Sequence, residues 1–146
     1  MMINATNIEQ AKGLIKSSKE KPIIVQAQND DFNRKILEYG KFDILLSPEA
    51  GKRKRTLRNI DSGFNHILAR IAAKNKVAVG IDIDEIARLT KEEKAKRLER
   101  IIQNIKTCRK AKTRIKLLNY KDKKNALSLL LSLGASTKQA KEALTF

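Results

Sequence analysis

The chain has 146 residues, the size of one ordinary domain, and its single cysteine, Cys108, cannot form an internal disulfide. Lysine and arginine number 32 against 16 acidic residues, which gives a formal net charge of +16. No run approaches the roughly 20 apolar residues of a membrane span, and the first residues lack a signal-peptide pattern. We therefore expect a soluble, cytoplasmic protein that folds as a single domain over residues 1–146 and makes no contact with a membrane.

The first third of the sequence alternates between strand and helix patterns. Asn7 precedes apolar residues at helical spacing, as a capping residue does, and the carboxylates of Asp30 and Asp31 suit the first turn of another helix. Pro22 opens a β-branched run that is typical of a buried strand. The expected segments are a short strand at 2–4, a helix at 7–16, a strand at 23–27, a helix from 30 to about 40 and a strand at 42–46, closed by Ser47-Pro48.

The rest of the chain continues this alternation after a polar connection, residues 49–60, which shows neither period. Thr90 and Glu93 form a capping box at the start of the longest helix. That helix is expected to face the core with Leu98, Ile101, Ile102 and Ile105. The expected segments are a helix at 61–74, a strand at 76–83, a helix at 90–108, a strand at 114–118, a helix at 123–133 and a short last helix capped by Ser136 with Gln139.

Strands separated by helices predict βα units joined in a parallel sheet. The pattern contains four clear strands and a possible fifth at the start of the chain. A closed barrel of eight βα units takes around 250 residues, more than this chain has. The sequence therefore predicts an α/β fold of four to five βα units, either an open sheet or a partial barrel.

The positive charge is concentrated after residue 50. Residues 1–50 hold seven basic and seven acidic groups, so the later residues carry the whole excess, which predicts a surface that faces a polyanion. The densest basic cluster follows the strand at 42–46, at a sheet edge where α/β proteins gather ligands. A loop with so many cations is not expected to bury itself; the alternative to RNA binding is a solvated loop. The cations expected to contact RNA phosphates are Lys52, Arg53, Lys54, Arg55 and Arg58.

A second group of candidate RNA-binding residues lies on the helix at 61–74. His66, the single histidine, falls outside the apolar stripe and shares a helix face with Arg70 and Lys74. His66 would bond to RNA or stack on a base; the alternative is a surface or capping histidine satisfied locally. Because the chain has only four Phe and two Tyr and no Trp, recognition through phosphates and RNA shape is expected rather than base-by-base reading.

Residues that could support catalysis are sparse. One histidine and one cysteine cannot form a metal cluster or a histidine-assisted nucleophile with the usual spacings. Asp82 and Asp84, with Glu85 next, end the strand at 76–83, so a metal-dependent phosphoesterase or nuclease stays open as an alternative. Asp84 is otherwise expected to cap the segment that follows. Cys108 lies on the inward face of its helix and is expected to be buried.

Residues 61–80 resemble the signature of the archaeal-type ribonuclease P protein component 3 family. The resemblance rests on an Asp61-x-Gly63-x-x-His66 sequence and on a Lys-Asn-x-Val-Ala sequence at 74–78. Ser47-Pro48 and the basic stretch precede them in the order that the family shows, and the tail at 129–143 is also similar. The resemblance covers most of the chain.

This resemblance implies a TIM-like barrel of the PHP type without the metal-binding histidines of related phosphoesterases, here begun partway into the barrel. It implies a non-catalytic subunit that binds and supports the catalytic RNA of ribonuclease P in 5′-leader removal from precursor tRNA. The implied partners are that RNA, a small ferredoxin-like protein subunit and other ribonuclease P proteins, with precursor tRNA contacted indirectly. No cofactor is expected on the protein, since Mg²⁺ serves the RNA. A general RNA-binding or ribosome-associated protein stays open as an alternative.

Overall fold

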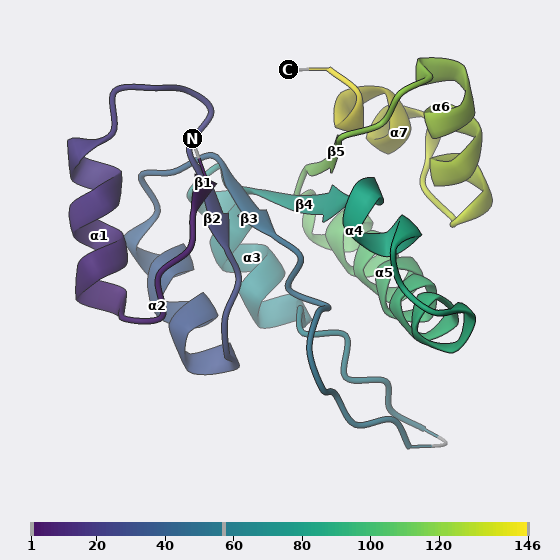
Figure 1. Cartoon of the computed structure of the whole chain (residues 1–146), viewed down its shortest axis with the longest axis horizontal. Helices are drawn as coiled ribbons and strands as arrows, with labels where there is room; N and C mark the ends of the chain where they lie inside the picture. Colours follow the sequence, from purple (N-terminus) through teal and green to yellow (C-terminus); the bar gives the residue numbers. More distant parts are fainter. Residues whose placement is uncertain (1, 57, 146) are drawn as a thin grey trace.

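The computed structural model describes residues 2–56 and 58–145. Its strands form one parallel sheet in the order β1-β2-β3-β4-β5, with β1 and β5 at the edges (Figure 1). Each strand pairs with the next along the chain, because a helical crossover returns the chain to the same edge before every new strand. The strands are β1 (Met2–Ile3), β2 (Ile24–Gln26), β3 (Ile44–Leu46), β4 (Ala78–Asp82) and β5 (Ile115–Leu118). The predicted α/β fold with four to five βα units is confirmed.

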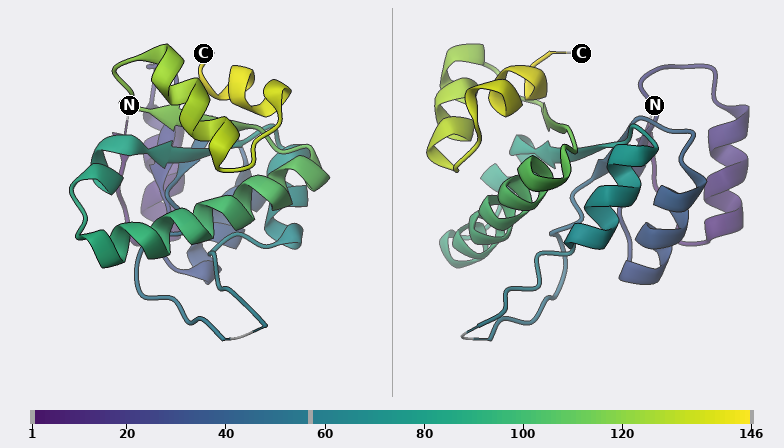
Figure 2. Two further views of the ribbon diagram at one scale, coloured as in Figure 1. Left: turned by 90° about the vertical axis from the view of Figure 1, so that its right-hand side faces the viewer. Right: turned by 180° about the vertical axis from the view of Figure 1, so that it is seen from behind.

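The helices pack side by side in the order of the strands. α1 contacts α2, α2 contacts α3, and α3 contacts α5, while α7 contacts both β5 and α6 (Figure 2). The helices are α1 (Ile8–Ser17), α2 (Asp30–Tyr39), α3 (His66–Lys74), α4 (Ile83–Ala87), α5 (Lys91–Ala111), α6 (Lys123–Ser132) and α7 (Thr137–Ala143). In the described part of the chain, no helix combines the length and apolarity needed to cross a membrane.

Alternate strand residues face opposite sides of the sheet. Those on the helix side belong to the main hydrophobic core, and they include Val25, Leu45, Val79 and Leu117. On the other side, Ile44 and Leu46 are buried beside Gly80, where an added Cβ would lie 2.7 Å from the Ile44 Cγ2 atom. Cys108 is buried as predicted, and burial raises the pKa of its thiol to about 12.

The helix predicted from Asp61 begins at His66. Asn65 is its N-cap, and the Asn65 side chain accepts a hydrogen bond from the Leu68 backbone N–H at 2.9 Å. Gly63 has a φ of +76°, a left-handed conformation that a helix cannot contain. The apolar periodicity extended the predicted helix too far, because Phe64 is buried from an irregular segment rather than from a helix.

Candidate nucleic-acid interface

The connection between β3 and α3, residues 47–65, is named here the basic loop. It leaves the carboxyl edge of the sheet, where ligand-binding loops of parallel sheets gather. Its two arms run antiparallel, with a bridge between Arg55 and Ile60, and the Thr56 N–H donates to the Asn59 carbonyl at 2.8 Å. The loop projects away from the sheet and passes beside α5 (Figures 1 and 2). All five cations of the predicted cluster lie on it.

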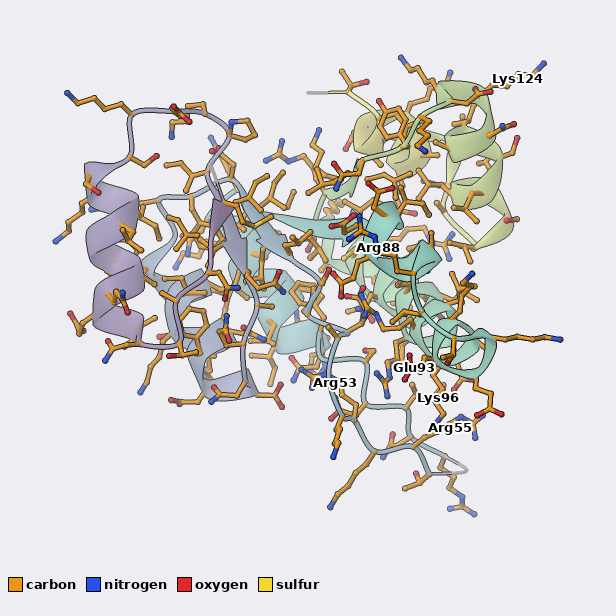
Figure 3. The ribbon with its side chains drawn as sticks, in the orientation of Figure 1. Arg53, Arg55, Arg88, Glu93, Lys96 and Lys124 are labelled. Carbon is orange, nitrogen blue, oxygen red and sulfur yellow. The ribbon has the colours of Figure 1, made fainter. Side chains whose placement is uncertain are left out.

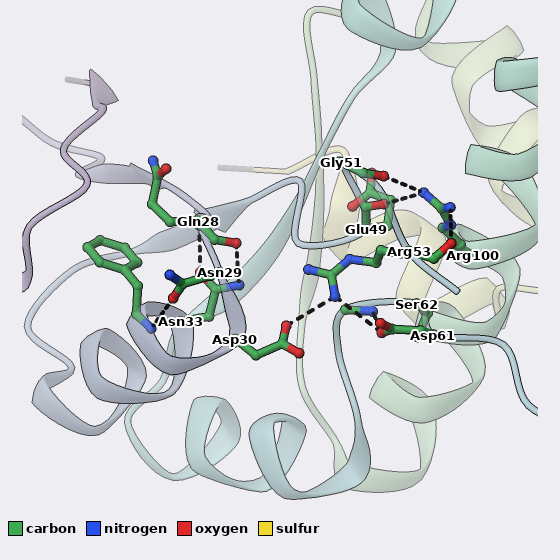
Figure 4. A network of polar contacts seen from close by, with 12 residues as sticks. Gln28, Asn29, Asp30, Asn33, Glu49, Gly51, Arg53, Asp61, Ser62 and Arg100 are labelled. Carbon is green, nitrogen blue, oxygen red and sulfur yellow. Dashed lines mark hydrogen bonds and ion pairs between the residues drawn. The ribbon is translucent and has the colours of Figure 1, made fainter. Parts of the chain in front are cut away.

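Arg100 of α5 holds the outgoing arm of the basic loop through backbone carbonyls. Its guanidinium donates to the carbonyl oxygens of Glu49 at 3.0 Å, Gly51 at 3.1 Å and Arg53 at 3.3 Å (Figure 4). Three donors of one planar group thereby fix three alternate residues of the loop. The shape of this arm therefore depends on a helix that lies about 50 residues away along the sequence.

The returning arm is held by the same face of α5. Gln103 Nε2 donates to the Ile60 carbonyl at 3.0 Å, and Asn104 Nδ2 donates to the Ser62 carbonyl at 3.2 Å. The prediction that Ile102 faces the core is wrong, because its side chain is 46% exposed while polar residues occupy the side of α5 that meets the loop. No residue of this polar face of α5 was among the site residues predicted from the sequence.

A buried ion cluster lies where the basic loop leaves β3. The Arg97 guanidinium is 3.3 Å from Glu49 Oε1 and 2.9 Å from Glu85 Oε1. Burial raises the pKa of the Glu49 carboxyl above its ordinary value, and the positive charge of Arg97 offsets part of that rise. The cluster joins the end of β3 to α4 and α5, and each buried charge depends on the other for compensation.

Arg53 differs from the other cations of the predicted cluster because it is buried. Its side chain is 8% exposed, and Nη1 contacts Asp30 Oδ1 at 3.0 Å and Asp61 Oδ1 at 3.2 Å (Figure 4). Gly63 permits this packing, since an added Cβ would lie 2.0 Å from the Pro48 carbonyl oxygen and 2.7 Å from Arg53 Cζ. The expectation that the loop would bury none of its cations is therefore wrong for Arg53, because two carboxylates compensate its charge.

The other four cations of the basic loop, Lys52, Lys54, Arg55 and Arg58, are exposed. Arg55 forms an ion pair with Glu99 of α5, with 2.5 Å between Nε and Oε1. Among residues 2–56 and 58–145, no carboxylate lies within ion-pair distance of Lys52, Lys54 or Arg58. The loop thus presents uncompensated positive charge on a backbone already held in place, which lowers the ordering cost of binding a polyanion.

The second predicted group lies along α3. His66, Arg70 and Lys74 are all exposed, as the helical spacing predicts. His66 is the first residue of α3 and lies at the base of the basic loop, whereas Lys74 is about 12 Å farther along the helix axis. Because α3 runs back toward the opposite edge of the sheet, the structure brings His66 to the loop and carries Lys74 away from it.

Asp82 is the last residue of β4, and Asp84 follows it at the same sheet edge. Asp82 Oδ1 accepts hydrogen bonds from the backbone N–H groups of Asp84 at 3.0 Å and Glu85 at 3.4 Å, and from the Asn119 amide at 2.9 Å. The cap of α4 is therefore Asp82, and the prediction of a cap at Asp84 is wrong by two residues. Within the described ranges, no group of three or more His, Cys, Asp or Glu side chains is arranged to hold a metal ion.

Comparison with known sequences finds relatives that share the same protein name. No family model matches the chain. Ribonuclease P protein component 3 of Methanothermobacter thermautotrophicus is 30% identical over 112 residues, which cover 75% of this chain and 43% of that protein. The proteins of the same name from Methanococcus maripaludis (strain C7) and Methanocaldococcus jannaschii are 28% and 27% identical over 76% and 74% of this chain. Those matches cover 46% and 44% of the two relatives, so the chain spans somewhat less than half their length.

A solved structure has the same fold. It is a chain in a cryo-EM structure of archaeal ribonuclease P with mature tRNA, and the match has a TM-score of 0.81 at 23% identity. The match covers 97% of this chain and 62% of that chain, which is consistent with a partial TIM-like barrel. The sequence matches and the shared fold confirm the predicted resemblance, and the chain is a relative of archaeal ribonuclease P protein component 3.

Proposed function

We propose that this chain is an RNA-binding protein subunit of ribonuclease P and supports the removal of the 5′ leader from precursor tRNA. The observation that carries the proposal is the sequence similarity to proteins named ribonuclease P protein component 3 over three quarters of the chain. The fold match to a chain of archaeal ribonuclease P with mature tRNA supports it.

The basic loop is the proposed RNA-binding surface. Lys52, Lys54, Arg55 and Arg58 would contact phosphates, where cations supply affinity without reading sequence. His66 would add a hydrogen bond or a stacking contact at the base of the loop. Arg53 is proposed to shape the loop from inside, and Arg70 and Lys74 contribute only where the RNA continues along α3.

In this proposal the protein performs no bond cleavage. The RNA and its Mg²⁺ ions supply the chemistry, and the protein, a single domain over residues 1–146, binds and supports the RNA. The local roles of Asp82 support this division, since its carboxylate already accepts three hydrogen bonds from the protein. A small ferredoxin-like subunit and the other ribonuclease P proteins are the proposed protein partners, in the cytoplasm, with precursor tRNA contacted indirectly.

Reconstitution tests the function directly. The ribonuclease P RNA and the other protein subunits of the same organism are assembled with and without this chain, and cleavage of precursor tRNA is measured. Omission of the chain is expected to lower the cleavage rate or raise the Mg²⁺ concentration that cleavage needs. Cleavage that is the same with and without the chain would overturn the proposal. Mg²⁺-dependent cleavage by the chain alone would favour the nuclease alternative instead.

A matched pair of variants tests the surface. Lys54→Gln with Arg58→Gln removes two exposed charges from the basic loop, and Lys16→Gln with Lys19→Gln removes two exposed charges from the neutral first third. The loop variant is expected to bind ribonuclease P RNA about tenfold more weakly, with a log–log salt slope less steep by about 1.5. The control pair should bind nearly as the parent does. Equal affinity of the parent chain for unrelated RNAs would favour a general RNA-binding protein.

A further inference from the structure

A groove of about 440 Å³ lies between the basic loop and the first half of α5, and it is named here the α5 groove. The loop side is formed by residues 51–53, and the α5 side includes Glu93, Lys96 and Arg100. Figure 3 shows Arg53, Arg55, Glu93 and Lys96 gathered where the loop passes this helix. The sequence-based site contained Lys52 and Arg53 but no residue of α5.

The cations of the α5 groove fall into two classes. Arg53 and Arg97 have buried side chains, and their charges are compensated by carboxylates of the protein. Lys52 and Lys96 are exposed, and in residues 2–56 and 58–145 no carboxylate lies within ion-pair distance of either ammonium group. Arg100 donates hydrogen bonds to backbone carbonyls and forms no ion pair within the same residues, so no carboxylate compensates its charge either.

The walls of the α5 groove are held in place before any ligand binds. Three hydrogen bonds from Arg100 fix the loop wall, and Thr90 caps the helix that forms the other wall, its Oγ1 accepting from the Glu93 N–H at 3.3 Å. A charged groove with fixed walls binds an anion without having to order a mobile segment first.

The lining of the α5 groove decides which part of a nucleic acid it suits. No aromatic side chain lines it in the described structure, so there is no ring on which a base could stack. Cationic donors predominate, and Glu93 is the single carboxylate among the lining residues. Such a lining matches a phosphate rather than a base.

We propose that the α5 groove binds a phosphodiester of the RNA backbone between Lys52, Lys96 and Arg100. The proposal rests on the proposed RNA-binding function, which it extends from the basic loop to α5. A strand that lies along the exposed loop cations reaches the groove at Lys52, because this residue belongs to both surfaces. One continuous backbone therefore bridges the loop and the helix.

Two pairs of variants on α5 test the groove with controls from the same helix. Lys96→Gln removes a groove cation, and Lys91→Gln removes an exposed lysine of the first turn that does not line the groove. Glu93→Gln removes the groove carboxylate, and Glu92→Gln removes its exposed neighbour. Binding of a fluorescein-labelled RNA hairpin to the full chain is measured by anisotropy over a range of salt concentrations.

Lys96→Gln is expected to weaken hairpin binding about fivefold and to make the salt slope shallower by about 0.7 to 0.9, as loss of one phosphate contact does. Glu93→Gln is expected to strengthen binding, and both controls should stay within about twofold of the parent. Effects of equal size in groove variants and controls would overturn the proposal. A structural role of Lys96 alone would not predict that removal of Glu93 changes affinity in the opposite direction.

Two further measurements separate the possible failures. AMP and inorganic phosphate are titrated against the labelled hairpin, and displacement at micromolar concentrations would assign the groove to a small phosphate compound and overturn the RNA assignment. The Lys54→Gln, Arg58→Gln variant is measured in parallel. Loss of affinity in that variant, without a difference between groove variants and controls, would reject the groove and leave the proposed function intact. No measurable binding of RNA by the parent chain would reject both.

Discussion

β3 and β4 are neighbours in the sheet, yet the chain leaves them in two different ways. After β4, Asp82 caps α4 through residues two and three positions ahead. After β3, the basic loop projects from the sheet edge and is held by side chains 23 to 51 residues away in sequence. The backbone after β4 is capped by local hydrogen bonds, whereas the long loop after β3 takes its shape from tertiary contacts.

The comparison shows how a strongly basic segment becomes an ordered surface. The inner charges at the β3 exit, on Arg53 of the loop and Arg97 of α5, are compensated by carboxylates of α2, α4 and the loop itself. The outer charges, on Lys52, Lys54 and Arg58, are left uncompensated in the described structure. At the β4 exit, the Asp82 carboxylate instead accepts hydrogen bonds from the backbone and from the Asn119 amide.

Replacement of Arg97 should have the largest effect on the β3 exit. Arg97→Met keeps much of the side-chain volume but leaves Glu49 buried without a counter-charge, and the free energy of unfolding should fall by about 3–5 kcal/mol. Urea unfolding followed by circular dichroism measures this change. Arg88→Met, at an exposed arginine after α4, is the control and should change stability by less than about 0.5 kcal/mol. Equal changes in the two variants would show that the ion cluster does not hold the loop.

Substitution of two glycines of the basic loop distinguishes the cost of steric crowding from the cost of a left-handed backbone conformation. Gly63 and Gly51 both have positive φ, of +76° and +86°, but an added Cβ clashes at Gly63 and meets open space at Gly51. Gly63→Ala should destabilise the chain by about 2–4 kcal/mol, whereas Gly51→Ala should cost about 1 kcal/mol. Thermal and urea unfolding of both variants check the difference. A similar cost at the two positions would mean that the Pro48 carbonyl moves away from the new methyl group.

Removal of the cap after β4 should have a smaller effect. Asp82→Ala loses the hydrogen bonds at the start of α4, and the free energy of unfolding should fall by about 1 kcal/mol. Asp84→Ala is the matched control, with an expected change below about 0.5 kcal/mol. RNA affinity should not fall in either variant. A fall in affinity would bring the β4 exit into the RNA-binding surface and remove the contrast between the two exits.

The smallest expected effect concerns the exposed ion pair between Arg55 and Glu99. Glu99→Gln should change the free energy of unfolding by less than about 0.5 kcal/mol, because exposed ion pairs contribute little. The same change frees the Arg55 guanidinium for phosphate, so RNA affinity should rise by roughly twofold. Anisotropy with the labelled hairpin measures it, with Glu92→Gln as the control. Weaker binding would show that Glu99 holds Arg55 in its RNA-contacting position.

Much of the fold could be predicted from the sequence because helix caps and apolar periods are local signals. Asn7 caps α1 and Thr90 caps α5 as predicted, and five βα units follow from the alternation of patterns. The start of α3 was predicted five residues too early. Phe64 has the spacing of a helical apolar stripe, although it is buried from the irregular segment before the helix. The resemblance at residues 61–80 also lies within the sequence, and the comparisons confirm it.

The sequence by itself determined the order of the elements, the basic character of the later two thirds and the relationship to ribonuclease P protein component 3. Only the tertiary structure decided which cations face solvent. Lys52, Arg53 and Lys54 are adjacent and alike in charge, yet Arg53 is buried because Asp30 of α2 and Asp61 on the returning arm of the basic loop compensate its charge. Burial of a charge depends on how the folded chain brings such carboxylates together, which the sequence pattern around Arg53 does not record.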